Sequence, residues 1–163
     1  MNKLLGVFLV IIGIPLSSVA GEPITGISQP IGDTGWSWTL SNTPRQHLQL
    51  SVTDGNPVVY DISECIFCSG EDDNCEENGI YQVNLQDNEP AIAVVCHKGA
   101  HSQRLQLLAP LRDRQKPAFT VTGDYWVNYQ PLPIGFKVSY DRRGDDGAPM
   151  MHTVFWPEQV TDE

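Results

Sequence analysis

Short alternations of polar and apolar residues recur along the chain, which is the pattern of half-buried β-strands. In 47–52 and in 80–85 every second residue is apolar, so the apolar side chains of each stretch share one face. Glycine and proline separate these stretches, and none shows helical periodicity. We therefore predict an all-β domain, a single antiparallel β-sandwich of about nine short strands with a barrel as the alternative. The other expected strands are 36–40, 58–62, 91–97, 102–109, 119–122, 125–129, 136–140 and 152–156.

Two turn signals predict which of these strands are neighbours. The sequence Asp54-Gly55-Asn56-Pro57 favours a tight hairpin between 47–52 and 58–62. Between 91–97 and 102–109, a three-residue loop with Gly99 in the left-handed conformation predicts a second hairpin. In that register His97 lies directly opposite His101.

The first 20 residues have the features of a secretion signal. Lys3 precedes an almost wholly apolar stretch, 4–16, and Ser18 and Ala20 supply small residues for cleavage. The stretch is shorter than the about 20 apolar residues that span a bilayer. We predict a cleavable signal peptide at 1–20 and a single β domain at 21–163, located in the periplasm or secreted. A buried N-terminal strand or helix is the other interpretation.

The net charge of the chain limits the kind of partner that the protein is expected to bind. The chain carries 20 acidic residues against 10 lysines and arginines, for a formal charge of −10; without 1–20, which contain only Lys3, the charge is −11. Such a charge disfavours nucleic acid and anionic membranes, and it favours a basic protein partner. Ten acids fall in 46–97 and eight cations in 98–143. These segments either steer a basic partner or lie together in the fold and neutralise each other.

Four cysteines in an exported chain predict two disulfides, with three possible pairings. We favour Cys68–Cys75, which closes an acidic loop, and Cys65–Cys96, which joins two strands. The Cys65-x-x-Cys68 spacing also occurs in redox proteins, but there it begins a helix in a βαβ unit. A four-cysteine zinc site requires two close pairs, which this spacing does not provide.

The loop 69–79 is a candidate partner-binding site. It contains five carboxylates within a segment that Cys75 can brace, so it can present negative charge to a basic cleft on another protein. Calcium also prefers such oxygen clusters, although the spacing does not match the helix–loop–helix calcium motif. The five residues are Glu71, Asp72, Asp73, Glu76 and Glu77.

The predicted His97/His101 pair is a candidate metal site. Opposed strand residues have Cβ atoms about 5 Å apart, so two imidazoles can share a Zn²⁺ or Cu²⁺ ion if further ligands are present. His152 is a conceivable third ligand, and Met150 and Met151 beside it suit copper(I). The alternative is two hydrogen-bonded or solvent-facing histidines at a hairpin tip.

No catalytic signature accompanies these features. The Gly-x-Ser-x-Gly elbow of serine hydrolases is absent, and on a strand His101 and Ser102 would point to opposite faces. We therefore predict no enzyme and no required cofactor. The favoured function is an envelope protein that binds another protein, as an inhibitor or neutraliser of a basic exported enzyme. A zinc- or copper-binding protein is the alternative, and a hydrolase without a recognisable motif is the third hypothesis.

Overall fold

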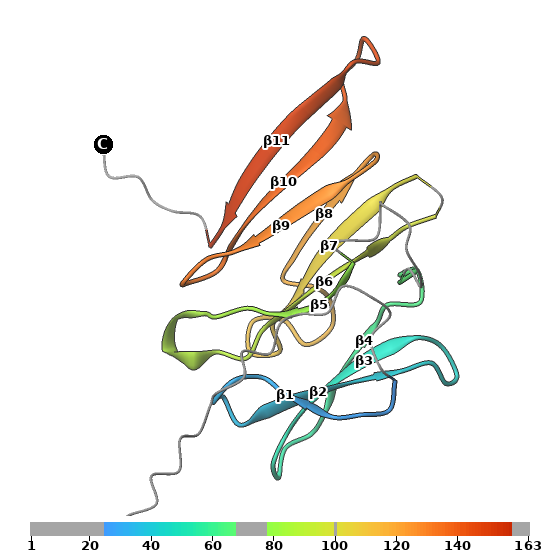
Figure 1. The fold of residues 1–163 in the computed structure, drawn as a ribbon. Coiled ribbons are helices and arrows are strands. Elements are labelled where there is room, and N and C mark those ends of the chain that lie inside the picture. The colour runs from blue at the N-terminus through green and yellow to red at the C-terminus, as the bar shows by residue number, and fades with distance from the viewer. Residues whose placement is uncertain (1–24, 68–77, 100, 158–163) are drawn as a thin grey trace, which may run out of the picture.

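The alternating stretches fold into three antiparallel β-sheets in a computed structural model that describes residues 25–67, 78–99 and 101–157 (Figure 1). Neighbours run β1-β2-β3-β4 in the first sheet, β5-β6-β7-β8 in the second and β11-β10-β9 in the third. A short 3₁₀ turn, Gln86–Asn88, lies between β5 and β6. The strands are β1 (Gln29–Pro30), β2 (Trp36–Ser41), β3 (His47–Val52), β4 (Val58–Asp61), β5 (Gly79–Gln82), β6 (Ile92–His97), β7 (Gln103–Leu108), β8 (Phe119–Gly123), β9 (Val127–Pro131), β10 (Phe136–Arg143) and β11 (Pro149–Trp156).

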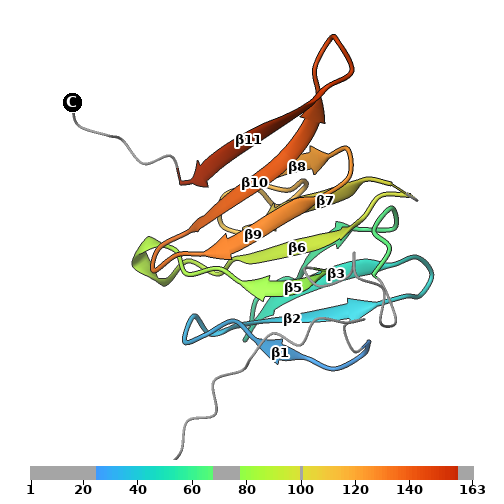
Figure 2. The same cartoon turned by 45° about the horizontal axis from the view of Figure 1, so that its top comes forward.

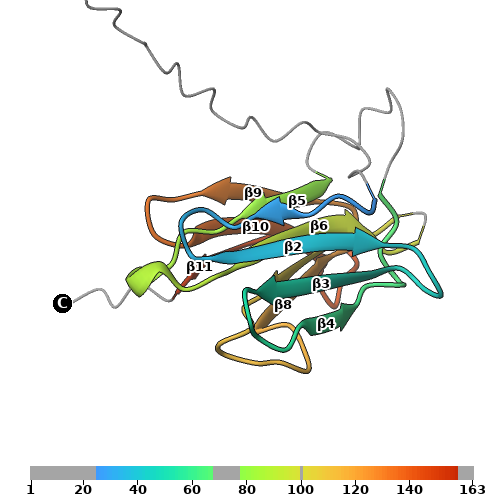
Figure 3. The ribbon, with the colours of Figure 1, turned by 90° about the horizontal axis from the view of Figure 1, so that it is seen from below.

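The second sheet lies between the other two, so that the fold has three layers (Figures 1 and 2). One face of it packs against the β1–β4 sheet, which is in front when the molecule is seen from below (Figure 3). The other face packs against the β9–β11 sheet. Two separate apolar cores result, one on each side of the middle sheet.

Strand β6 explains why three layers form. Ile92 and Val94 belong to the core shared with the first sheet, whereas Ala93 and Val95 belong to the core shared with the third. All four are 0% exposed. A strand covered on both faces is apolar without alternation, and 91–96 is such an uninterrupted run.

The prediction of an all-β antiparallel fold is therefore confirmed, and among the described residues no sheet closes into a barrel. The predicted hairpin of β3 and β4 is present, with Leu50 paired to Val58. The third sheet extends the predicted sandwich by one layer. In the part of the chain that the structure describes, no helix has the length and apolar character needed to cross a membrane.

The Tyr60 side chain connects the first sheet to the loop after β7 through a hydrogen bond. Its side chain is 2% exposed, and its hydroxyl donates a hydrogen bond to the Asp113 carbonyl oxygen at 2.5 Å. Burial, followed by the charge of the nearby Asp113 carboxylate, raises the pKa of Tyr60 to about 12. The fold therefore holds this phenol in its neutral form.

This shift predicts a loss of stability at high pH. An unfolded tyrosine has a pKa of about 10, so the unfolded chain loses this proton first and the stability due to the neutral phenol decreases as pH rises from 10 to 12. In urea unfolding experiments, Tyr60→Phe should cost about 1 kcal/mol near pH 8, where a hydrogen bond is lost. The variant should also lose less stability than wild type between pH 10 and 12. Parallel pH profiles for the two proteins would contradict the assignment.

Candidate functional site

Several residues that the sequence singles out lie outside the described residues. They comprise the predicted signal segment 1–20, the five carboxylates of the acidic loop and two of the four cysteines. Their predicted roles, including the Cys68–Cys75 pairing, stay predictions. The individual residues are Glu71, Asp72, Asp73, Glu76, Glu77, Cys68 and Cys75.

The predicted juxtaposition of His97 and His101 is wrong. His97 pairs with Gln103, and the Lys98 amide donates to the Ser102 carbonyl oxygen at 2.7 Å, so the turn lies one residue further along the chain than expected. Gly99 does adopt the left-handed conformation, with φ of 77°. The shift has a clear cause: both backbone hydrogen-bonding groups of His97 pair with Ile66, outside the hairpin, at 2.9 Å each.

The three candidate metal ligands lie in different settings. His152 is on β11, directly opposite Tyr140 on β10, and their rings stack with centroids 5.2 Å apart. His97 ends β6, with its Nε2 atom 3.5 Å from the Gln103 amide nitrogen, while His101 is in the loop that follows. Among the described residues no three histidine, cysteine, aspartate or glutamate side chains are grouped so as to hold a metal ion.

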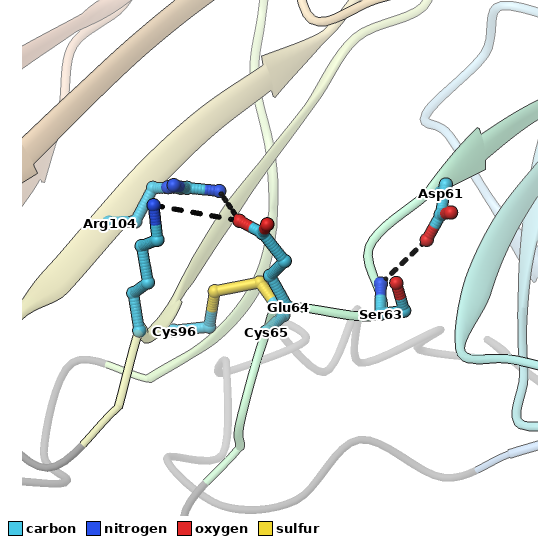
Figure 4. Close-up of a disulfide and its surroundings, with 7 residues drawn as sticks. Asp61, Ser63, Glu64, Cys65, Cys96 and Arg104 are labelled. Carbon is cyan, nitrogen blue, oxygen red and sulfur yellow. Dashed lines mark hydrogen bonds and ion pairs between the residues drawn. A yellow bond between two sulfur atoms is a disulfide. The ribbon is translucent and has the colours of Figure 1, made fainter.

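The predicted Cys65–Cys96 disulfide is confirmed, with Cα atoms 5.4 Å apart (Figure 4). It joins the segment after β4 to β6. An ionic contact parallels it, because the Glu64 carboxylate accepts a hydrogen bond from Arg104 at 3.0 Å and lies 3.6 Å from the Lys98 ammonium. The hydrogen bond from Arg104, and then the charge of Lys98, lower the pKa of Glu64.

The ion pairs show how the acidic and basic segments of the chain are placed relative to each other in the fold. Arg112 also pairs with Glu89, at 2.7 Å. Every ion pair found in the described ranges thus joins the acidic segment 46–97 to the basic segment 98–143. In the described fold the two segments are neighbours that partly neutralise each other.

Strand β11 forms an outer edge of the third sheet (Figure 2). Eight residues long, it contains no aspartate, glutamate, lysine or arginine. The other edge strands, β1, β4, β5, β8 and β9, have between two and five residues. Natural proteins usually protect sheet edges with short strands, charges or prolines. The only such device in β11 is Pro149, its first residue, so this edge is open to a further strand.

The hairpin geometry shows which backbone groups point outward. The Gly144 amide donates to the Ala148 carbonyl oxygen at 2.8 Å, so this pair is hydrogen-bonded across the hairpin. Hydrogen-bonded and non-hydrogen-bonded pairs alternate along an antiparallel ladder. The pairs that contain Met151, Thr153 and Phe155 are therefore non-hydrogen-bonded, and the amide and carbonyl groups of these three residues point away from β10.

The same three residues are exposed, whereas His152, Val154 and Trp156, which alternate with them, are partly buried. The exposed fraction is 62% for Met151 and 40% for Phe155. Backbone groups and apolar side chains are thus available on one strand. Sequence reasoning missed this site, although the uncharged run 149–156 was visible, because the pattern does not reveal which strand lies at an edge.

A polar hollow of about 310 Å³ opens elsewhere, on the β9 side of β10. It is lined by His101, Asp124, Tyr125 and Arg143, which come from the loop after β6, the turn after β8 and the end of β10. The fold thus brings His101 to an aspartate and an arginine that the sequence did not connect with it.

Searches against protein-family models, curated proteins and solved structures found no match for this chain.

Proposed function

We propose that this protein is a non-catalytic binding protein that takes up an extended segment of a partner protein along the free edge of β11. The outward backbone groups of Met151, Thr153 and Phe155 are the observation that carries the proposal. Added strands gain affinity from main-chain hydrogen bonds and specificity from alternate side chains. Met151 and Phe155 supply those side-chain contacts, so the partner segment carries apolar residues at alternate positions.

The location of the protein and the charge of its partner belong to the same proposal. We propose that the chain is exported through a cleavable signal at 1–20, and the Cys65–Cys96 disulfide supports an oxidising compartment such as the periplasm or the extracellular space. The formal charge of −10 attracts a basic partner over long range. A basic exported enzyme that is inhibited or neutralised by the added contact is the partner class we favour.

Thr153→Pro tests the edge directly. Proline removes the outward amide of residue 153 without removing a hydrogen bond to β10, so the hairpin is retained while strand addition is blocked. In pull-downs from an envelope extract with the tagged chain, recovery of the specific partner should fall by at least about tenfold, as expected when a central ladder bond and its register are lost. High salt should reduce the rate of capture for the wild type.

Thr153→Val is the matched control. It removes the hydroxyl that contacts the Ser139 hydroxyl at 3.0 Å, as the proline variant does, but it keeps the backbone amide. Recovery with this variant should equal that of wild type. A second test, Met151→Ser with Phe155→Ser, leaves the backbone intact and should also lose the partner. A partner captured equally by all these variants, with melting temperatures unchanged, would exclude β11 as the binding edge.

A further inference from the structure

The polar hollow beside β10 is formed by both of the sheets that meet there. His101 approaches from the second sheet, and Arg143 lies at the end of β10 in the third sheet. Asp124 and Tyr125 come from the turn that connects the two sheets. In the third sheet β10 lies between β9 and β11, and no residue of β11 lines the hollow, so the hollow is independent of the proposed strand-binding surface.

The turn that forms one wall is held in place by Asp141 on β10. This carboxylate, 3% exposed, accepts hydrogen bonds from the backbone amides of Tyr125 at 3.0 Å and Trp126 at 2.9 Å. The Asp124 amide donates to the Asp141 carbonyl oxygen at 3.0 Å. These contacts fix the backbone of the turn that carries Asp124 and Tyr125, which lowers the entropy lost when a ligand binds there.

Two opposite charges line the hollow without forming an ion pair. The Asp124 carboxylate accepts a hydrogen bond from the backbone amide of Arg143 at 2.6 Å. The Arg143 guanidinium instead lies over the Tyr125 ring, 5.2 Å from its centroid, and donates to the Tyr125 hydroxyl. Within the described ranges no carboxylate oxygen lies within 4.0 Å of the guanidinium nitrogens. A guanidinium has five N–H donors, so most of those on Arg143 stay available to a ligand.

We propose that this hollow binds a small zwitterion, a free amino acid or a short peptide. Its carboxylate is bound by the Arg143 guanidinium, whose fork of donors matches a carboxylate. His101, which also lines the hollow, offers a further hydrogen-bonding group. Its ammonium group is bound by Asp124. A ligand with both charges satisfies both side chains at once, whereas a simple anion is repelled by Asp124 and a simple cation by Arg143. The volume of about 310 Å³ is at the lower end of ligand pockets.

Titration of the ¹⁵N-labelled chain with glycylglycine tests the proposal. Amide signals of Asp124, Tyr125 and Arg143 should shift in a saturable manner. Acetate, methylammonium and inorganic phosphate, each with one kind of charge, should bind at least about tenfold more weakly, because each leaves one charged contact unmade. No shift with glycylglycine at about 50 mM, far above a millimolar dissociation constant, would overturn the proposal. Equal binding of acetate or phosphate would overturn it too.

Two substitutions assign the roles of the charges. Arg143→Gln removes the guanidinium but keeps the backbone amide, which donates a hydrogen bond to Asp124. Asp124→Asn removes the negative charge but keeps an oxygen that can accept this hydrogen bond. Each should weaken glycylglycine binding by at least about tenfold. Arg142→Gln removes a neighbouring exposed cation that does not line the hollow, and it should bind like wild type. Undiminished binding by Arg143→Gln, or an equal loss with Arg142→Gln, would reject the assigned site.

Discussion

Replacing Gly135 with alanine is expected to lower the free energy of unfolding by about 3 kcal/mol or more, from backbone strain and overpacking combined. Gly135 lies in the turn between β9 and β10 with φ of 75°, a conformation that costs a residue with a side chain about 1–2 kcal/mol. An added Cβ would also overlap the Trp156 carbonyl oxygen and approach the Pro157 Cδ atom to 2.6 Å. In the alanine variant the backbone at the end of β11 must therefore move.

Gly147→Ala separates the two causes in the same urea unfolding experiment. Gly147 has φ of 78°, but an added Cβ at this position has no atom within 4 Å. Its substitution should cost only the conformational term, about 1–2 kcal/mol. Equal losses for the two variants would show that β11 does not pack against Gly135 as described.

Removing the Cys65–Cys96 disulfide is the second large effect that we expect. The two cysteines are 31 residues apart, and the loss of a cross-link over that distance corresponds to about 3–4 kcal/mol in the chain-entropy relation. Cys65→Ala with Cys96→Ala should therefore shift the urea midpoint strongly under non-reducing conditions. The paired substitution leaves no odd cysteine among the four.

Glu64→Gln is the matched control for the disulfide. It removes the ionic contacts from the segment after β4, which also carries Cys65, to Lys98 after β6 and to Arg104 on β7 (Figure 4). Because the Glu64 side chain is 66% exposed, solvent screens these contacts and the midpoint should barely change. A cysteine double variant no less stable than Glu64→Gln would mean that the bond contributes nothing to the fold.

The local pattern of polar, apolar and turn residues was sufficient to predict most strands and one hairpin. Strand β3 alternates polar and apolar residues, and the turn 54–57 carries the residues that a tight hairpin needs, so strand period and turn chemistry agree there. The Cys65–Cys96 bond was also among the predicted pairings, because the even cysteine count and the predicted export favoured disulfides. In each case the information lies within a few residues or in composition.

The register at His97 shows where local pattern is insufficient. A three-residue loop after His97 was chemically reasonable, but the pairing of His97 with Ile66 on its other side placed the turn one residue later. Ile66 is 31 residues away in sequence, and no periodicity within the hairpin reports on it. The metal site inferred from the expected register lost its geometric basis for this reason.

The amino-acid sequence by itself determined the all-β class and the approximate positions of most strands, and it favoured the Cys65–Cys96 pairing among the possible ones. Only the tertiary structure decided that β6 is covered on both faces, that β11 has a free edge and that His101 lies beside Asp124 and Arg143. Strand formation depends on side-chain alternation, which is local. Layer order, edges and hollows depend on contacts between segments far apart in the chain, and these are set by the packing of whole sheets.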